Sequence, residues 1–356
     1  MERTRSSNDI VQESQRLADE VLFPAALTTD ASTVVPRSLL DSLASAGLYG
    51  LAGPLDAGGL AVDAETAGRV VEALAGGCLT TTFVWAQHHG AVRTIARAGK
   101  EMRQRWLAPL CSGECRAGVA FGSLRRPGRP LLVASRDGEG WVLDGTAPWV
   151  TGWERIDVVH VAARTDDGKV VWSLVDAVSS PGLHAAALEL AAVSASSTVT
   201  LTFSRLRVEP ERVTLVEPFD EWQARDRAGL RPNGSLALGL ARRCATLLDS
   251  SELTRSVDMA RTLLDAAGPE ELPDARAHAS ALALDAATKL VVASGGRAVT
   301  CGDHAQRLAR EALFLLVFGQ SPAIRDAQLA LLRDRADRAR PRARPAARLA
   351  VGHDAP

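Results

Sequence analysis

Residues 140–153 read GWVLDGTAPWVTGW, and this stretch decides how the middle of the chain is interpreted. It follows an Asp-Gly turn, continues as a β-branched and aromatic run, and ends with Thr151 between Trp149 and Trp153. Aromatic residues make up only 4% of the 356 residues, so two tryptophans around one hydroxyl are unusual here. Two interpretations stay open at this point: ordinary strand packing, or the wall of a site that needs a flat apolar surface beside one hydrogen-bond partner.

The neighbouring segments continue the β pattern. Asp-Gly turns in RDGEG (136–140) and TDDGK (165–169) each lie between β-branched runs and predict two hairpins. Further along, STVTLTFSRLRVEP (197–210) alternates, with Val199, Leu201 and Phe203 on one face. These signals predict an antiparallel, barrel-like β domain over residues 117–213.

Helical periodicity dominates the rest of the chain. The stretch SLLDSLASAGLYG (38–50) predicts a helix capped by Ser38 and ending near Gly47, and PDARAHASALALDAATKLVVASGG (273–296) predicts a long one. We therefore expect an α+β, multi-domain fold with an N-terminal helical domain (1–116), the β domain, and a C-terminal helical bundle (214–332). The Arg- and Pro-rich residues 333–356 have no apolar face, so we expect a disordered tail there, with an anion-binding arm as the alternative.

Composition excludes several classes of function. The formal net charge of −1 gives no support for a nucleic-acid or membrane-surface partner. The five cysteines are scattered without CxxC spacing, so no metal site is expected. The polar start and the lack of a membrane-length apolar run predict a cytoplasmic protein. No GxGxxG or P-loop pattern points to a nicotinamide or ATP enzyme.

Five segments in this order, over about residues 10–332, resemble the acyl-CoA dehydrogenase flavoprotein superfamily. They are GLYGLAGPLDAGGLAVD (47–63), GKEMRQRWLAPLCSGE (99–114), GWVLDGTAPWVTGW (140–153), FSRLRVEPERV (203–213) and QRLAREALFLLVFGQSPAI (306–324). The chain looks most like the members that act on acyl carrier proteins in polyketide pathways, where methoxymalonyl and hydroxymalonyl extender units are made.

The resemblance implies FAD as the cofactor. It makes Trp149 a wall of the isoalloxazine ring and Thr151 a hydroxyl partner near N5, where fixed donors in a dry pocket act most strongly. A second flavin loop is expected at GVAFGSLRRPGRP (118–130), where Phe121 would be a wall and Ser123 would contact the pyrimidine half.

The resemblance defines fewer residues for the AMP half of FAD than for the flavin ring. Gly295 and Gly296 would let the chain approach the cofactor or a neighbouring subunit, although a plain helix stop explains them equally well. The family's arginine-x-x-phenylalanine-glycine segment has no match, so nothing is assigned to the AMP half of FAD. Sharing of flavin between subunits in the family implies a homo-oligomer, a dimer or a tetramer.

On the substrate side, Arg125, Arg126 and Arg129 form a basic cluster in the second loop. This cluster could bind the phosphate of a CoA or phosphopantetheine arm, or an acidic carrier protein. The alternative is a solvated loop without a ligand. His88 is a candidate substrate contact, with a structural histidine pair as the alternative.

The catalytic base of the family has no obvious counterpart. Family members that desaturate an acyl thioester remove the α-proton with a glutamate, and the aligned position here is Gly319; the alternative family position falls on Gly229-Leu230. The weak candidates near it are Gln320 and Ser321, which could orient a substrate oxygen, and Glu311, with Asp226 as a further remote possibility. A positioned base contributes about 10²–10⁴ in rate, so its loss disfavours α,β-desaturation.

We therefore expect a flavin-dependent oxidoreductase that acts on a small acyl thioester, carried by an acyl carrier protein or CoA, in making a hydroxymalonyl or methoxymalonyl extender unit. Two alternatives stay open. One is a monooxygenase that uses reduced flavin from a separate reductase, and the other is a non-catalytic family member.

Overall fold

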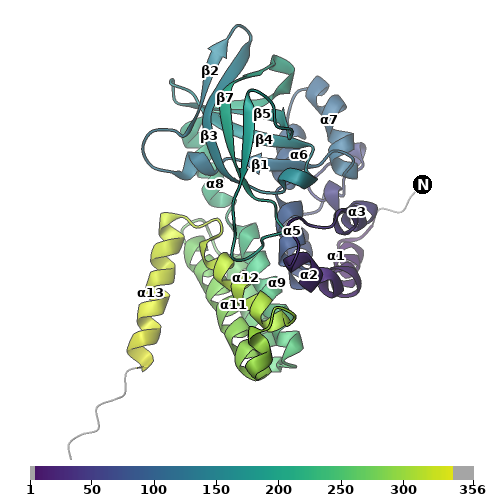
Figure 1. Ribbon diagram of the computed structural model, residues 1–356, viewed down its shortest axis with the longest axis vertical. Helices are drawn as coiled ribbons and strands as arrows, with labels where there is room; N and C mark the ends of the chain where they lie inside the picture. The colour runs from purple at the N-terminus through teal and green to yellow at the C-terminus, as the bar shows by residue number, and fades with distance from the viewer. Residues whose placement is uncertain (1–4, 340–356) are drawn as a thin grey trace, which may run out of the picture.

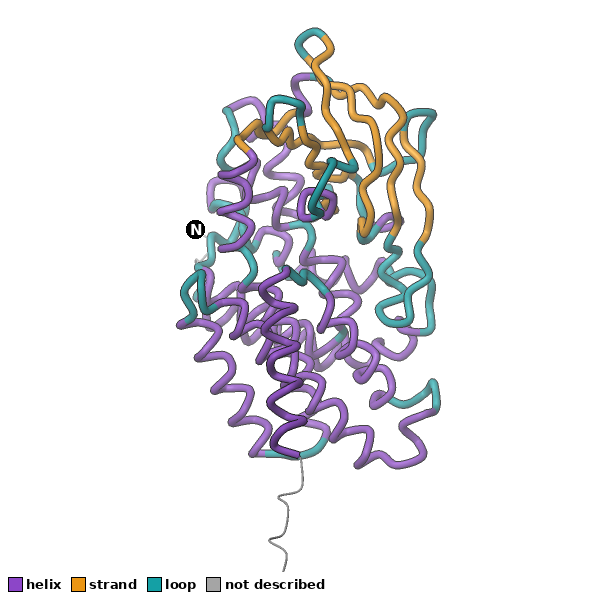
Figure 2. The backbone as a smooth tube through the Cα atoms, turned by 90° about the vertical axis from the view of Figure 1, so that its left-hand side faces the viewer, coloured by secondary structure: helices purple, strands orange, loops and turns teal. Residues whose placement is uncertain are grey.

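The computed structural model describes residues 5–339, arranged as a helical N-terminal part, a β domain and a C-terminal helical bundle (Figure 1). The strands gather at one end of the molecule and helices fill the other (Figure 2). This is the predicted fold class, which is confirmed. No helix in residues 5–339 has the length and apolarity needed to cross a membrane.

The N-terminal part contains seven α-helices among the described residues. They are α1 (Ser7–Leu17), α2 (Phe23–Asp30), α3 (Arg37–Ser45), α4 (Ala64–Gly77), α5 (Leu79–Ala86), α6 (His89–Ile95) and α7 (Lys100–Ser112). Helix α3 begins one residue before the predicted cap Ser38, because Pro36 is the N-cap residue and supplies the fixed φ that starts the helix. The first helix begins with a capping box in which Ser6 and Asp9 bond each other's backbone.

The β domain is one eight-stranded sheet in the order β6-β7-β3-β2-β4-β5-β8, with β1 paired to β4. Its strands are β1 (Ala117–Ala120), β2 (Leu132–Asp137), β3 (Gly140–Val150), β4 (Val158–Arg164), β5 (Lys169–Asp176), β6 (Leu183–Ala187), β7 (Val199–Val208) and β8 (Val213–Pro218). Both predicted hairpins, β2–β3 and β4–β5, are present and antiparallel. Val199, Leu201 and Phe203 are buried on one face, as their alternation predicts.

The sheet is mixed, where an antiparallel one was expected. Strand β1 pairs with β4 in parallel, and β2 meets β4 in parallel at one position. The reason is that β1 enters the sheet from helix α7 and not from a hairpin, so no tight turn fixes its direction. The last strand also continues to Pro218, beyond the predicted boundary at residue 213.

The C-terminal part contains α8 (Phe219–Ala228), α9 (Arg231–Leu247), α10 (Ser251–Ala266), α11 (Leu272–Ser294), α12 (His304–Val317) and α13 (Pro322–Ala339). Helix α13 continues through residues 333–339, so the first part of the predicted disordered tail is helical instead. This short run of Arg, Asp and Ala favours a helix by intrinsic propensity even without an apolar face. Residues 340–356 of that predicted tail lie outside the described residues.

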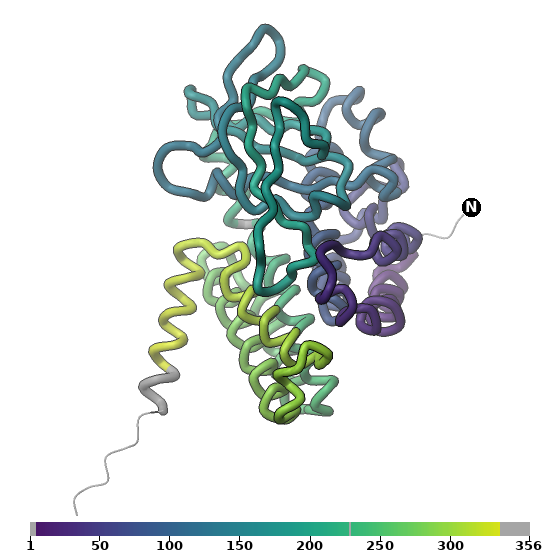
Figure 3. Tube along the Cα trace, viewed as in Figure 1, coloured from purple at the N-terminus to yellow at the C-terminus, as the bar shows by residue number. Residues whose placement is uncertain are grey.

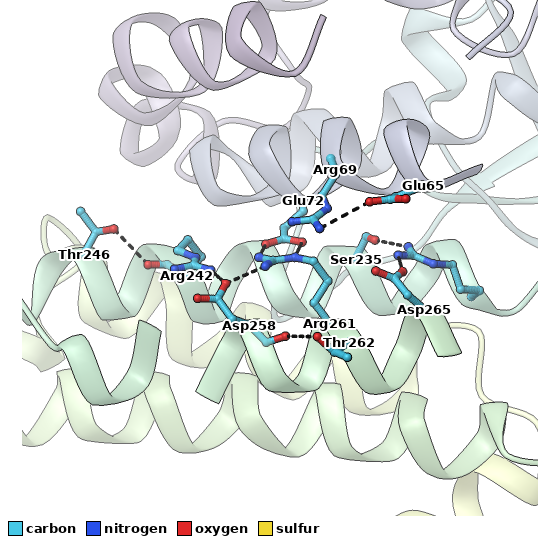
Figure 4. A network of polar contacts seen from close by, with 11 residues as sticks. Glu65, Arg69, Glu72, Ser235, Arg242, Thr246, Asp258, Arg261, Thr262 and Asp265 are labelled. Atoms are coloured by element: carbon cyan, nitrogen blue, oxygen red, sulfur yellow. Dashed lines mark hydrogen bonds and ion pairs between the residues drawn. The ribbon is translucent and has the colours of Figure 1, made fainter. Parts of the chain in front are cut away.

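Buried ion pairs join the N-terminal helices to the bundle (Figure 4). Arg261 on α10 donates to both carboxylate oxygens of Glu72 on α4, and both side chains are more than nine-tenths buried. Arg261 also pairs with Asp258, which accepts from Arg242 on α9. Breaking such a buried pair leaves one charge unpaired and costs about 3–5 kcal/mol.

The connection between β6 and β7 descends from the sheet and lies between the two helical parts (Figure 3). Its Ala195 carbonyl accepts a hydrogen bond from the amide of Val35, and its Ala191 carbonyl accepts one from Arg310 of α12. One loop therefore holds the sheet, the N-terminal helices and the bundle in a fixed relation, and the candidate site depends on that relation.

Candidate functional site

A bulge near the end of β3 turns Trp149 out of the sheet. The pairing of β3 with β7 shifts register between Ala147 and Val150, and Trp149 takes a positive φ of 64°. Such a conformation costs a non-glycine residue about 1–3 kcal/mol. The neighbours Ala147 and Val150 are fully buried, whereas the indole of Trp149 is 59% exposed. The strained backbone therefore presents a large flat apolar surface that the protein itself does not cover.

Thr151 follows the bulge and lies inside the protein. Its side chain is 2% exposed, and its hydroxyl lies 3.2 Å from that of Thr198, which in turn lies 2.8 Å from the Ser196 hydroxyl. A hydroxyl has one donor and two acceptor positions, so this chain leaves Thr151 capacity for a further partner. Gly152 next to it has a φ of 87°, which lets the chain turn sharply.

The second predicted flavin loop lies beside the first. It consists of Phe121 and the short 3₁₀ turn Gly122–Arg125, and a Cβ atom built on Gly122 would lie 3.5 Å from the Pro148 carbonyl oxygen. Ser123 in this turn is 4% exposed, and its hydroxyl has no hydrogen-bond partner among the described residues. An unpaired buried hydroxyl costs free energy unless a ligand satisfies it.

These two loops fit a flavin. Trp149 offers an uncovered aromatic face, Ser123 a hydroxyl with no protein partner, and Thr151 a buried hydroxyl with spare capacity. Ring surface and a few fixed polar groups are what a flavin ring system needs from its site. Phe121 is partly buried against Trp172, with ring centroids 6.3 Å apart.

A glycine in a left-handed conformation occupies the position predicted for the family's glutamate. Gly319, in the loop between α12 and α13, has a φ of 60°, which L side chains rarely adopt. A Cβ atom built there would lie 2.5 Å from Nδ2 of Asn233 and 4.0 Å from Nη1 of Arg125. The left-handed backbone would strain a glutamate at this position, and the Asn233 side chain would have to move to admit it.

Two arginines lie around this glycine. Arg125 forms a two-point ion pair with Asp226 of α8, through Nε (2.8 Å) and Nη2 (2.7 Å). Arg276 of α11 is 2% exposed and donates to the carbonyl oxygens of Leu230 (2.9 Å) and Phe318 (3.3 Å), while its Nε has no partner among the described residues. Burial, and then the nearby Arg125, lower the pKa of Arg276 to about 10. The region is therefore positively charged.

Aromatic side chains connect this region to the flavin loops. Phe83 on α5 contacts Phe314 and Phe318 edge to face, with ring centroids 5.1 Å and 4.9 Å apart. The next residue, Val84, lies 3.1 Å from the point where a Cβ atom of Gly152 would be. Helix α5 thus contacts both the hairpin end at Gly152 and the phenylalanine next to Gly319.

The other predicted base candidates serve the scaffold. Gln320 donates to the Leu316 carbonyl and to Gln328, and the Ser321 hydroxyl accepts from the Ile324 amide at the start of α13. Glu311 is 1% exposed, and both its oxygens accept hydrogen bonds from Arg307 in the same helix. Burial raises the pKa of Glu311. Glu311 is therefore enclosed in the bundle and already paired with Arg307, which disfavours it as a base.

His88, the predicted substrate contact, is buried. Its Nδ1 accepts from the Ala117 amide (3.0 Å) and its Nε2 lies 3.0 Å from the Leu110 carbonyl, so both ring nitrogens join α6 to β1 and α7. Burial lowers the pKa of His88 to about 3. The next residue, His89, is the histidine whose ring nitrogens have no partner among the described residues, and it packs edge to face on Trp85. The doublet in the sequence does not show which of the two is free.

The remaining candidates divide into two groups. Arg126 and Arg129 are exposed on the second loop, whereas Arg125 turns inward to Asp226, so the predicted cluster of three is not a single surface.

Gly295 and Gly296 end α11, 19 residues beyond Arg276 along the chain, and a Cβ atom on either would meet nothing within 4 Å. They do not contact the flavin loops described above. Asn233 is the site residue that sequence reasoning missed, because an asparagine in the first turn of a helix carries no pattern of its own.

Comparison with known proteins bears on these residues. A family model described as acyl-CoA dehydrogenase, N-terminal domain, matches residues 4–114. The mitochondrial short-chain specific acyl-CoA dehydrogenase of Bos taurus is 30% identical over 216 residues, which cover 58% of this chain and 52% of that protein. The chain thus spans about half the length of the curated relatives it matches.

Solved structures match over more of the chain. A glutaryl-CoA dehydrogenase of Mycobacterium smegmatis in complex with FADH2 superposes with a TM-score of 0.77 at 20% identity, covering 94% of this chain and 96% of that one. FkbI, described as acting in biosynthesis of the methoxymalonyl extender unit of the FK520 polyketide, gives a TM-score of 0.77 at 20% identity, with 91% and 99% covered. These likenesses establish the acyl-CoA dehydrogenase fold.

The chain is thus similar to acyl-CoA dehydrogenases in its N-terminal residues 4–114, and it has their fold. The described residues contain no cluster of side chains suited to a metal ion.

Proposed function

We propose that this protein is an FAD-dependent oxidoreductase that oxidises an oxygen-bearing carbon of a small acyl thioester and does not desaturate an acyl chain. The observation that carries the proposal is the loop at Gly319. The fold and the two flavin loops fit the cofactor, but the position of the family's glutamate has a positive φ and is filled by the Asn233 amide.

The magnitude of general-base catalysis supports this choice. Removing a proton from carbon without a positioned base forfeits about 3–5 kcal/mol of barrier lowering. A hydroxyl or a hydrated aldehyde releases its proton to solvent or a weak acceptor much more easily, so hydride transfer then depends mainly on alignment at about 3–3.5 Å. An enzyme that lacks the glutamate is suited to the second kind of substrate.

In this proposal the residues of the chain have distinct roles. FAD supplies the hydride acceptor when bound. Trp149 and Phe121 hold its ring between apolar surfaces, and Thr151 and Ser123 offer hydroxyls to its polar edge. Phe83, Phe314 and Phe318 exclude water and limit the acyl chain to a few carbons.

The likeness to FkbI and the basic second loop support a carrier-bound substrate. Arg126 and Arg129 are exposed beside the flavin loop, where an acidic carrier protein or the phosphate of its pantetheine arm could dock. A glyceryl thioester oxidised through its semialdehyde toward a hydroxymalonyl unit, the precursor of a methoxymalonyl unit, meets these requirements. Flavin sharing between copies of the chain, in a dimer or tetramer, belongs to the same proposal.

The test is to load the purified protein with FAD and titrate it anaerobically with glyceryl-loaded carrier protein. We expect the visible flavin absorption to bleach and the acyl group to lose about two mass units as its primary alcohol becomes the aldehyde. Once the flavin is reoxidised, the hydrated aldehyde gives up a second hydride, and the resulting acid is about 14 mass units heavier than the glyceryl group. Turnover that requires oxygen and a separate reductase would show a monooxygenase instead, and failure to take up FAD would show a non-catalytic protein.

A further inference from the structure

We propose that Arg125 and Asn233 form a receptor for a carboxylate on the acyl group, at the position where a catalytic glutamate would otherwise lie. This inference rests on the proposed function, because it concerns the acid that oxidation at the same site would yield. It makes the site bind the carboxylate form of the acyl group more tightly than a neutral acyl group of equal size.

The geometry places two unused donors at one point. Asp226 occupies the Nε and Nη2 side of Arg125, and in the described residues Nη1 has no hydrogen-bond partner. The same Nη1 lies 4.0 Å from the point where a Cβ atom of Gly319 would be, and Asn233 Nδ2 lies 2.5 Å from it. The Asn233 amide likewise makes no hydrogen bond to another described residue. A carboxylate has two oxygens and accepts well from a guanidinium and an amide together.

Neighbouring groups keep these donors in place. Asp226 fixes the plane of Arg125 from α8, and Arg125 lies over the Phe121 ring with 4.8 Å between the guanidinium carbon and the ring centroid. Arg276 donates hydrogen bonds to two carbonyl oxygens, that of Leu230 directly before α9 and that of Phe318 directly before Gly319. Arg276 is thus a positioning residue that holds the two segments of the receptor together.

The balance of charge also favours an anion. Two guanidinium groups, Arg125 and Arg276, lie near Gly319, and Asp226 is the carboxylate paired with one of them. Arg276 bonds only carbonyl oxygens, so its charge has no counter-ion in direct contact. A partly buried site with excess positive charge and free donors is stabilised by an incoming carboxylate and is indifferent to an ester.

The position of Arg125 and Asn233 suits the acyl end of a thioester better than the phosphate of its pantetheine arm. Gly319 follows Phe318, which packs on Phe83, and α5 leads from there to the hairpin end at Gly152. Arg126 and Arg129 of the second loop are exposed and are better placed for phosphate. In the proposal, the terminal carboxylate of a short acyl group meets the two donors beside these aromatic side chains.

The experiment compares two ligands that differ only in charge, malonyl-pantetheine and its methyl ester, by calorimetry on the FAD-supplemented protein. We expect the carboxylate to bind at least about tenfold more tightly than the ester, as charge-assisted hydrogen bonds of about 1.5–3 kcal/mol imply. Asn233→Leu, which keeps the branched side-chain shape and removes the amide donor, should cut that preference severalfold.

Arg125→Gln provides a second variant, which we also expect to lose the preference, and its melting curve shows whether the fold survives. Arg227→Gln is the matched control for it, since Arg227 is exposed on α8 beside Asp226 and its loss changes the net charge equally. We expect R227Q to keep the wild-type preference. Equal binding of acid and ester by the wild-type protein, or an unchanged preference in folded N233L, would overturn the receptor. FAD uptake and bleaching are measured separately, so failure of the proposed function is distinguishable from failure of this inference.

Discussion

The two halves of the candidate site differ in the groups that they leave free for a ligand. The flavin loops carry an uncovered indole at Trp149 on a strained backbone, together with an unpaired hydroxyl at Ser123. The loop at Gly319 instead has donors around it, the Asn233 amide and the guanidinium groups of Arg125 and Arg276. Strained and unsatisfied groups concentrate at functional sites. In the proposed function, the flavin loops serve electron acceptance and the loop at Gly319 takes no part in removing a proton from carbon.

The largest expected effect comes from trying to restore the base. Gly319→Glu forces a side chain onto a positive φ and into the Asn233 amide, so we expect the free energy of unfolding to fall by about 2–5 kcal/mol. Butyryl thioester should still fail to reduce the flavin. Denaturant unfolding and anaerobic titration measure the two outcomes. The double variant G319E/N233G relieves the collision, and if the single variant unfolded like the wild type, the loop geometry described here would be wrong.

The next largest expected effect is a loss of stability at acid pH, caused by the buried His88. Burial lowers the pKa of His88 to about 3 from an ordinary value of 6.5, so the folded state resists protonation more than the unfolded state does. Stability is therefore full above pH 6.5 and is lost as pH falls from 6.5 toward 3, by about 2 kcal/mol at pH 5 for one such histidine. Urea unfolding at several pH values checks this. His88→Gln should flatten the curve, and an unchanged curve in that variant would show that His88 titrates normally.

Trp149 should show opposite effects in the free and FAD-bound protein. Trp149→Gly relieves the positive φ and removes an exposed side chain, so we expect the protein without FAD to gain about 1 kcal/mol of stability. The same change should weaken FAD binding about tenfold or more, because the ring loses an aromatic wall. Thermal melts measure the stability of the protein without FAD, and flavin fluorescence measures its affinity for FAD. Trp153→Phe, in the same turn but partly packed on the core, is the comparison variant; loss of stability in W149G without FAD would contradict the assignment.

The smallest expected effect lies at the second loop. Ser123→Ala removes an unpaired buried hydroxyl, so the free protein should become more stable by up to about 1 kcal/mol while FAD affinity falls severalfold. Ser204→Ala, at an exposed position of β7, serves as the control and should change neither quantity. If S123A bound FAD as well as the wild type, Ser123 would have no part in the flavin site.

Sequence patterns predicted most of the fold because they are local. Asp-Gly turns between β-branched runs gave both hairpins, and the 3.6-residue period gave α11 almost to the residue. The parallel pairing of β1 and the helical residues 333–339 were not predictable in this way, since one depends on tertiary packing and the other on propensity without amphipathicity.

The site was predictable only in part, for the same reason. Trp149 and Thr151 stand out in a chain poor in aromatic residues, but the bulge that exposes one and buries the other appears only in the paired sheet. The absence of a carboxylate at Gly319 was readable from alignment with the family motif. The approach of Asn233 and Arg125 to that glycine was not, because they lie 86 and 194 residues away along the chain.

The most direct measurement of the central claim compares two short thioesters under anaerobic conditions with the FAD-loaded protein. One is butyryl-pantetheine, which can only be desaturated, and the other is glyceryl-pantetheine, which has an oxidisable hydroxyl. The account predicts that the hydroxyl-bearing thioester bleaches the flavin and the butyryl thioester does not. Rapid bleaching by butyryl-pantetheine alone would contradict it, because carbon deprotonation would then proceed in a site without the glutamate.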